Sequence, residues 1–391
     1  MPDDKTRGLA SRGPTGAPKI VSVFEHLPSK ILERFSVQGL IELVSAPPGL
    51  SFEQRQAWLL TELDGAHAAI VWPVAGPFGA EQIAATNASG KWEQGRFKVV
   101  TTFSVGTDAI DAAACSRAGI RVGYTPYISD DSVAEYTIAM LLHYCRRLVY
   151  LENLVMTNRF PQTMLDVLQD PTTNCGFSPA GKTVCFYGFG RIAQKVAEKL
   201  LAFGVSRIVY TASRPKPFTA DNFPRLLALR DTFYPDTSIS NEPSLAELVA
   251  QADILIVLCP GNKTTEATIN KSVLSRMKST AVLMNVARGN VVVNDDLLAA
   301  LRSNAISAAL LDVVQGEPHV GPDHPLLSPD LRDRVMVLPH SASTVAETRR
   351  LMCEVTARNI LTTLGFDEHL LGDKAVLSKQ HAWTHFSEPA K

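Results

Sequence analysis

Thr183-Val184-Cys185-Phe186-Tyr187-Gly188-Phe189-Gly190-Arg191-Ile192-Ala193 is the stretch that decides the fold. An apolar run typical of a buried strand precedes two glycines, and a helical pattern follows over residues 194–203. In this order the pattern G-x-G-x-x-[GA] predicts a dinucleotide-binding turn, in which Gly188 permits the turn and Gly190 the approach of a pyrophosphate. The helix that begins near Arg191 and Ile192 would offer its first N–H groups to the phosphates. The alternative is an ordinary strand-to-helix turn.

Strand-like apolar runs recur on both sides of this stretch, separated by helical segments. They lie at residues 19–24, 40–45, 68–72, 97–103, 120–123, 207–212, 253–258, 280–286, 306–311 and 335–338. Alternating strands and helices predict an α/β fold with parallel sheets covered by helices, and a chain of 391 residues predicts two domains. Two segments rich in Pro, Thr and Asn, residues 156–179 and 215–241, are predicted to be loops.

Composition excludes several classes of function. The net charge of −1 and the absence of a long basic run disfavour nucleic acid or an anionic membrane as partners, and no apolar run has membrane-spanning length. Six scattered cysteines without a C-x-x-C pair predict reduced thiols in the cytoplasm, with neither a disulfide framework nor a metal site. Residues 1–18 are polar and are predicted to form a disordered arm, and residues 372–391 a polar tail.

Three predicted strand ends after the glycine turn have the residue types needed to reduce a carbonyl. Arg288 would hold the carboxylate and carbonyl of a 2-oxo acid with its forked donors, and His340 would supply a proton. Glu317 beside that imidazole would orient it and favour its protonated form. Taken singly, each has a structural explanation: a surface arginine, a loop-capping acid, a histidine satisfied by backbone. Together, at successive strand ends of one dinucleotide-binding unit, they favour catalysis.

Together with these residues, further motifs along the chain resemble the D-isomer-specific 2-hydroxyacid dehydrogenase family, most closely its glyoxylate/hydroxypyruvate reductase branch. The resemblance covers roughly residues 97–365. The matching motifs are Ser104-Val105-Gly106, Arg121-Val122-Gly123-Tyr124-Thr125-Pro126, Ala134-Glu135, Gly188-Phe189-Gly190-Arg191-Ile192, Ala287-Arg288-Gly289, Leu311-Asp312-Val313, Glu317-Pro318 and Pro339-His340.

The resemblance implies two Rossmann-like, doubly wound parallel-sheet domains with the active site in the cleft between them. A flavodoxin-like substrate-binding domain would comprise residues 19–124 and 340–371, including a returning helix over residues 346–364, and a dinucleotide-binding domain residues 125–339. A homodimer through the cofactor domains is also implied. Arg288 would bind substrate, His340 would be the acid/base and Glu317 its partner. Val105 and Gly106 would offer N–H groups to the substrate carboxylate, with the loop of Val74, Ala75 and Gly76 nearby.

The cofactor choice follows from the residues after the next strand. A carboxylate about 20 residues past the glycine motif binds the ribose of NAD, but this chain has Ser213 there and no acid between residues 206 and 220. Ser213, Arg214 and Lys216 suit a 2′-phosphate, so NADP(H) is predicted to be preferred, with NAD(H) possible. Further predicted cofactor contacts at strand ends are Cys259, Pro260, Val286, Ala287, Asp312 and Ala342.

Two other functions remain open. A phosphoglycerate dehydrogenase-like enzyme is disfavoured because few residues follow residue 364, although short forms exist. A transcriptional corepressor of the same fold, which binds NAD(H), can keep the same three residues, but the missing acid near Ser213 argues against it. A formate dehydrogenase would have glutamine in place of Glu317. The sequence departs from the family at Ser341, where an apolar residue is usual, and in the loop over residues 73–77, which weakens any claim to a particular substrate.

Overall fold

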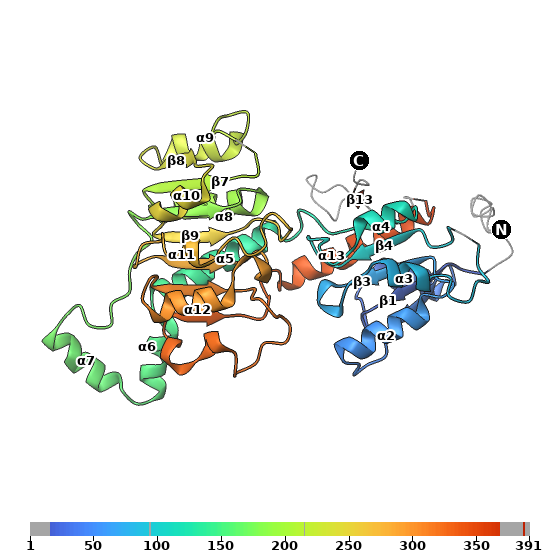
Figure 1. The fold of residues 1–391 in the computed structure, drawn as a ribbon, viewed down its shortest axis with the longest axis horizontal. Coiled ribbons are helices and arrows are strands. Elements are labelled where there is room, and N and C mark those ends of the chain that lie inside the picture. The colour runs from blue at the N-terminus through green and yellow to red at the C-terminus, as the bar shows by residue number, and fades with distance from the viewer. Residues whose placement is uncertain (1–15, 94, 215, 368–385, 388–391) are drawn as a thin grey trace, which may run out of the picture. The chain divides into compact units, whose positions relative to one another are not determined.

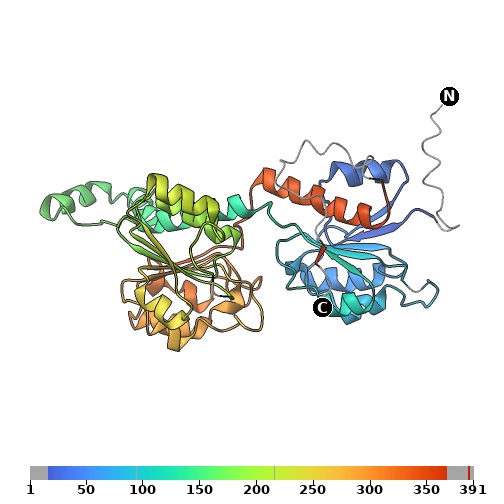
Figure 2. The same ribbon diagram turned by 90° about the horizontal axis from the view of Figure 1, so that it is seen from above.

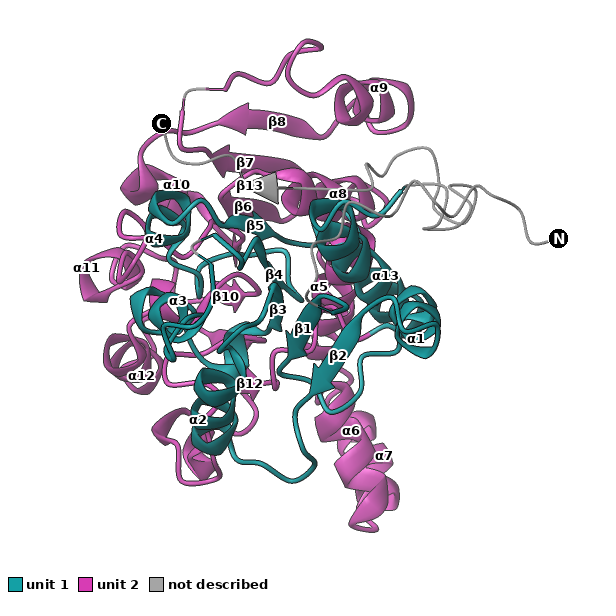
Figure 3. Ribbon diagram, turned by 90° about the vertical axis from the view of Figure 1, so that its right-hand side faces the viewer, with its two compact units in different colours: residues 1–129, 345–391 teal, residues 130–344 magenta. Residues whose placement is uncertain are grey.

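The protein is described from a computed structural model, which describes residues 16–93, 95–214, 216–367 and 386–387. The chain divides into two compact units: unit 1 comprises Met1–Ser129 with Val345–Lys391, and unit 2 comprises Asp130–Thr344 (Figure 3). The predicted borders lay after residues 124 and 339. The observed borders instead follow residues 129 and 344. The shift of the second border places His340 in the same unit as Arg288.

Unit 1 is built on a parallel sheet with one short antiparallel strand at its edge. Its strands are β1 (Lys19–Ser22), β2 (Glu42–Ser45), β3 (Ala68–Val71), β4 (Val99–Thr102), β5 (Arg121–Gly123) and the antiparallel β13 (Phe386–Ser387). The order β13-β5-β4-β3-β1-β2 has the flavodoxin-like arrangement 2-1-3-4-5 among its parallel strands. Its helices are α1 (Lys30–Val37), α2 (Phe52–Glu62), η2 (Pro73–Ala75), α3 (Ala80–Ala85), α4 (Ala112–Arg117) and α13 (Ala346–Thr363).

Alternate residues of these strands supply two separate cores. Ile20 packs in one core with Phe35 of α1 and Ile360 of α13, whereas Val21 packs in the other with Leu59 of α2. Successive side chains of a strand point to opposite faces, so a fully apolar strand needs helices on both. Figure 2 shows helices on both faces of each sheet.

Unit 2 has a larger sheet in which all strands are parallel. They are β6 (Thr183–Tyr187), β7 (Arg207–Thr211), β8 (Ser238–Asn241), β9 (Ile254–Val257), β10 (Val282–Asn285), β11 (Ala308–Leu311) and β12 (Val335–Val337), in the order β12-β11-β10-β9-β6-β7-β8. With β6 numbered as strand 1 and the order read from β8, the first six strands follow the doubly wound order 3-2-1-4-5-6. The predicted α/β class with two parallel-sheet domains is confirmed.

Helices cover both faces of this sheet as well. Residues of α5 (Asp130–Cys145), α8 (Arg191–Leu201) and α9 (Pro224–Phe233) share one core, and residues of α10 (Leu245–Gln251), α11 (Lys271–Leu274) and α12 (Asn294–Arg302) share the other. Short 3-10 turns are η3 (Gly289–Val291), η4 (Pro325–Leu327) and η5 (Pro329–Leu331). Two further helices, α6 (Leu148–Met156) and α7 (Phe160–Gln169), extend away from the sheet of unit 2 (Figure 1).

The two predicted loops were wrong in part. Residues 156–179 contain α7, and residues 215–241 contain α9 and β8. Proline lies in the first turn of α7 and of α9, where its missing N–H costs no helical hydrogen bond. Residues 1–15 of the predicted arm and most of the predicted tail lie outside the described residues. Within that tail, Phe386–Ser387 pair with β5.

Among the described residues, none of the helices combines the length and the apolar character needed to cross a membrane.

Candidate active site

The glycine turn lies where β6 and β9 are neighbours, which is the point at which the strand order of unit 2 reverses. Ligands of doubly wound sheets bind beyond the carboxyl ends of the strands at such a point. Gly188 has a φ of 93°, and a Cβ added there would lie 2.6 Å from the backbone N of Cys259. Glycine is therefore required for β6 to approach the end of β9, where Cys259 and Pro260 follow the strand.

Gly190 has a different role. A Cβ added there would meet nothing within 4 Å, so the turn leaves open space on this side. Gly190 is also the N-cap of α8 and has no side chain to accept from the first N–H groups of the helix, those of Arg191 and Ile192. These groups and the positive end of the helix dipole suit a phosphate. Buried Ala193 lets the same helix pack closely on the sheet.

We expect alanine to affect these two glycines in opposite ways. Gly188→Ala should lower the free energy of unfolding by about 3 kcal/mol, because it combines backbone strain with a clash. Gly190→Ala should change it by no more than about 0.5 kcal/mol, but should raise the Kd for a dinucleotide about tenfold or more by filling the space next to the pyrophosphate. Chemical denaturation and fluorescence titration would measure these effects. A Gly190→Ala protein that binds dinucleotide normally would contradict the assignment.

Ser213, Arg214 and Lys216 follow β7, which neighbours β6. The side chains of Ser213 and Arg214 are exposed, as the predicted contact with a 2′-phosphate requires. The ammonium of Lys216 lies 4.5 Å from the ring centroid of Phe223, and its carbonyl accepts a hydrogen bond from the Tyr210 hydroxyl. This cation–π contact holds the ammonium of Lys216 over the ring of Phe223.

Arg288 follows β10 and is positioned by a buried amide. The side chain of Asn285 donates to the carbonyl of Arg288 over 2.9 Å and accepts from the N–H of Ala287 over 3.1 Å, which fixes the turn through Val286 and Ala287. Gly289 then permits close contact with the next turn, because a Cβ there would lie 2.3 Å from the carbonyl oxygen of Val314. The half-buried guanidinium of Arg288 donates to the carbonyl of Ala287.

His340 and Glu317 form a pair beyond β11 and β12. The His340 Nδ1 lies 3.0 Å from Glu317 Oε1, with side-chain exposures of 42% and 29%. The second carboxylate oxygen of Glu317 accepts from the N–H of Val314. His340 adopts a left-handed φ of 50°. Since Nδ1 faces Glu317, Nε2 remains to meet a ligand.

Asp312 anchors the segment that includes His340. Only 1% of Asp312 is exposed, and its two carboxylate oxygens accept from the N–H groups of Ser341 and Ala342 over 2.7 and 3.0 Å. Its carbonyl accepts from the N–H of His340. Burial, and then the negative charge of Asp312, raise the pKa of nearby Tyr136 to about 12. Sequence reasoning assigned Asp312 to the cofactor and missed this anchoring role; the polar residue at the end of an apolar strand was the available signal.

In unit 1, the two predicted substrate loops emerge at one edge of the sheet. Val74, Ala75 and Gly76 follow β3, Val105 and Gly106 follow β4, and these strands pair in register. The side chain of Gln56 donates to the carbonyl of Ala75, and the Ser104 hydroxyl donates to the carbonyl of Gly106. Substrate binding by these loops stays a prediction.

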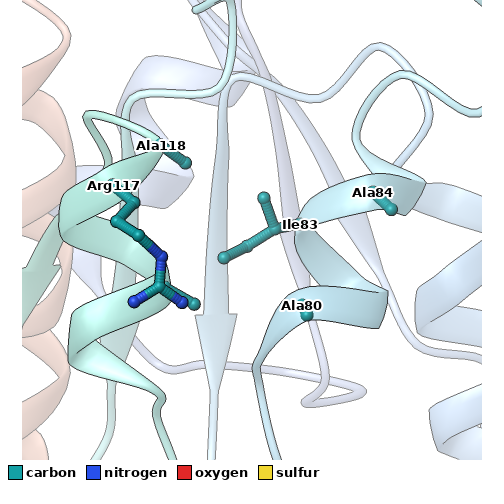
Figure 4. Close-up of a pocket in the computed structure, with 6 residues that line it drawn as sticks. Ala80, Ile83, Ala84, Arg117 and Ala118 are labelled. Carbon is teal, nitrogen blue, oxygen red and sulfur yellow. The ribbon is translucent and has the colours of Figure 1, made fainter.

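A groove in unit 1 includes none of the predicted residues. It lies between α3 and α4 and is lined by Ala80, Ile83, Ala84, Ala114, Arg117 and Ala118 (Figure 4). It is therefore not assigned to the site.

The sequence of the chain is similar to those of known proteins. Residues 138–342 match the model of the NAD binding domain of D-isomer specific 2-hydroxyacid dehydrogenases. The human glyoxylate reductase/hydroxypyruvate reductase is 37% identical over 273 residues, which are 68% of this chain and 74% of that protein. The glyoxylate reductase of Thermofilum pendens is 34% identical over 267 residues, covering 68% of this chain and 72% of that protein.

A solved structure is similar along most of the chain. The NADPH-dependent glyoxylate/hydroxypyruvate reductase of Sinorhizobium meliloti, in complex with NADP and malonate, has a TM-score of 0.68 and 26% identity, covering 90% of this chain and 94% of its own. The chain belongs to the D-isomer specific 2-hydroxyacid dehydrogenase family of NAD(P)-dependent oxidoreductases.

Proposed function

We propose that the protein reduces glyoxylate, hydroxypyruvate or a similar small 2-oxo acid to the D-2-hydroxy acid, with NADPH as the preferred cofactor. The observation that supports this most directly is the His340–Glu317 pair at 3.0 Å, in the same unit as Arg288 and the glycine turn. The relatives that are named for this activity support the substrate class.

Arg288, His340 and Glu317 of unit 2 each have a distinct role in this reaction. Arg288 binds the substrate carboxylate and polarises its 2-oxo group through the forked N–H donors. His340 donates a proton from Nε2 to the oxygen of that group, while Glu317 at Nδ1 holds the ring in place. In unit 1, the N–H groups of Val105 and Gly106 bind the substrate carboxylate, and the Val74–Gly76 loop contacts its side chain.

The cofactor occupies the carboxyl edge of the sheet in unit 2. A bound nicotinamide supplies the hydride. Gly188, Gly190, Arg191 and Ile192 hold the pyrophosphate. The other proposed contacts follow neighbouring strands of that sheet: Cys259, Pro260, Val286, Ala287, Asp312 and Ala342.

Exposed Ser213 and Arg214, with Lys216, bind the 2′-phosphate, which is the basis for preferring NADPH. Ser213→Asp should shift the preference toward NADH by about tenfold or more, because the new carboxylate repels the phosphate and accepts from a ribose 2′-hydroxyl. Steady-state kinetics with both cofactors would measure the ratio of the two kcat/KM values. An unchanged ratio would remove Ser213 from the assignment. Ser206→Asp, which lies before β7, is the matched control.

A substrate panel tests the proposed function. Purified protein would be incubated with NADPH or NADH and glyoxylate, hydroxypyruvate, phosphohydroxypyruvate or pyruvate, and the loss of cofactor absorbance followed. We expect turnover of the first two acids. Tight dinucleotide binding without turnover would instead favour a corepressor, and turnover of phosphohydroxypyruvate alone would favour a phosphoglycerate dehydrogenase.

The protein is further proposed to be a cytoplasmic homodimer that associates through unit 2. Helices α6 and α7 expose apolar side chains that include Val155 at 60%, Met156 at 79% and Leu168 at 82%. A patch of this kind marks an interaction surface. The free state of all six cysteines supports a reducing compartment.

Charge on this patch should break the dimer. A Met156→Glu/Leu168→Glu double variant should have half the molar mass of the wild type in light scattering, whereas Val37→Glu, at an 89% exposed apolar position of unit 1, should not. A wild type that is monomeric at micromolar concentration would contradict the proposal.

A further inference from the structure

We propose that Asp130 is a positioning residue that competes with the cofactor pyrophosphate for the guanidinium of Arg191, and thereby limits how tightly NADPH is held. The inference rests on the proposed placement of the cofactor at the N-terminus of α8. It concerns Asp130, the first residue of α5, which is not among the residues assigned to the site above.

The two side chains meet where α5 and α8 begin. The Nε of Arg191 donates to Oδ2 of Asp130 over 2.9 Å. The Asp130 side chain is only 7% exposed, whereas that of Arg191 is 46% exposed. The carboxylate is therefore fixed inside unit 2, while the guanidinium of Arg191, the residue directly after Gly190, reaches solvent.

The carboxylate depends strongly on this contact. Its other oxygen, Oδ1, is buried and has no hydrogen-bond partner among the described residues. A buried carboxylate is costly unless it is paired and hydrogen-bonded. Arg191 is thus the positive charge that compensates Asp130.

The pyrophosphate of a bound dinucleotide would also interact with the guanidinium of Arg191. It would lie against Gly190 and the first N–H groups of α8, directly before Arg191 in the chain. The Asp130 carboxylate binds Nε and is held near the same positive charge that a phosphate would approach, so the two anions repel each other and compete for the placement of the guanidinium. The cofactor is therefore bound less tightly, and dissociates faster, than it would if Asp130 carried no negative charge. Fast release suits an enzyme that must exchange its cofactor in every turnover.

The next ion pair provides a matched control. Asp131 pairs with Lys195 over 3.1 Å between the same two helices. Lys195 lies four positions beyond Arg191, away from the helix N-terminus, and Asp131 is 63% exposed. Removing this carboxylate changes the charge of α5 equally but leaves Arg191 in place.

The experiment compares Asp130→Asn with Asp131→Asn in the full-length protein. We expect the Kd for NADPH to fall about three- to tenfold in Asp130→Asn, with a proportionally slower dissociation rate in stopped-flow displacement. The KM for NADPH should fall with it and the KM for hydroxypyruvate should not, a split that general destabilisation would not produce. Asp131→Asn should match the wild type. Unchanged or weaker NADPH binding by Asp130→Asn would overturn the inference.

A double variant tests whether Asp130 acts through Arg191. Compared with Arg191→Gln alone, Asp130→Asn/Arg191→Gln should show no gain in affinity, and a gain over that single variant would overturn the inference. If Asp130→Asn does not fold, Asp130→Ser replaces it, because its smaller side chain leaves room for water. Failure of the wild type to bind either dinucleotide would overturn the proposed cofactor site itself, which is distinguishable from normal wild-type binding with no gain in the variants.

Discussion

Replacing His340 with glutamine is expected to lower kcat for hydroxypyruvate about a thousandfold, while the Kd for NADPH changes by less than about twofold. Glutamine keeps a polar side chain near Glu317 but cannot deliver a proton to the forming alkoxide. Its backbone can still be held by Asp312, whose carbonyl accepts from the N–H of His340 and whose carboxylate accepts from the two following N–H groups. Steady-state kinetics and fluorescence titration would separate the two effects.

The control for this variant is His143→Gln on α5, a half-buried histidine outside the proposed site. It should keep wild-type kcat and wild-type affinity. A His340→Gln protein that retained most of its kcat would show that another group supplies the proton.

Arg288→Lys should lower kcat/KM for hydroxypyruvate about a hundredfold or more, although the charge is kept. A planar fork can bind a carboxylate and the adjacent carbonyl together, whereas an ammonium is a point charge on a flexible stem. The Asn285 amide fixes the backbone that directs this side chain, so a lysine would start from the same place and still lack the fork. The loss should appear in both KM and kcat, because Arg288 polarises the carbonyl that reacts.

Exposed Arg276 supplies the control for that substitution, since Arg276→Lys makes the same chemical change between α11 and β10, outside the proposed site. It should leave kcat/KM unchanged. Equal kinetics for Arg288→Lys and Arg276→Lys would remove Arg288 from substrate binding.

The features that could be predicted from the sequence were those with a local pattern: a strand, a turn, or a polar residue directly after an apolar strand. The strand β6 and the glycine turn were recognisable because an apolar run, two glycines and a helical pattern follow one another directly. Arg288 and His340 could be proposed because polar residues at the ends of apolar strands gather at one edge of a parallel sheet. Helices α7 and α9 were missed because proline and polar residues suggested loops, although proline is compatible with a first turn.

What could not be predicted depends on contacts between distant segments. The carboxylate of Asp312 meets the N–H of Ser341, 29 residues later, only because β11 and β12 are neighbours. The Asp130–Arg191 pair joins residues 61 positions apart and exists only because α5 packs on α8. The position of Asp312 at the end of an apolar strand could have marked it as a candidate, but in neither contact does the local sequence identify the partner, which depends on how the strands and helices pack.

The most direct test of the central claim is the product formed from hydroxypyruvate by the wild-type protein with NADPH. The account predicts oxidation of NADPH in equal amount to the glycerate formed, with the D enantiomer as the product in chiral chromatography. Tight binding of NADPH with no glycerate formed, or formation of the L enantiomer, would contradict it.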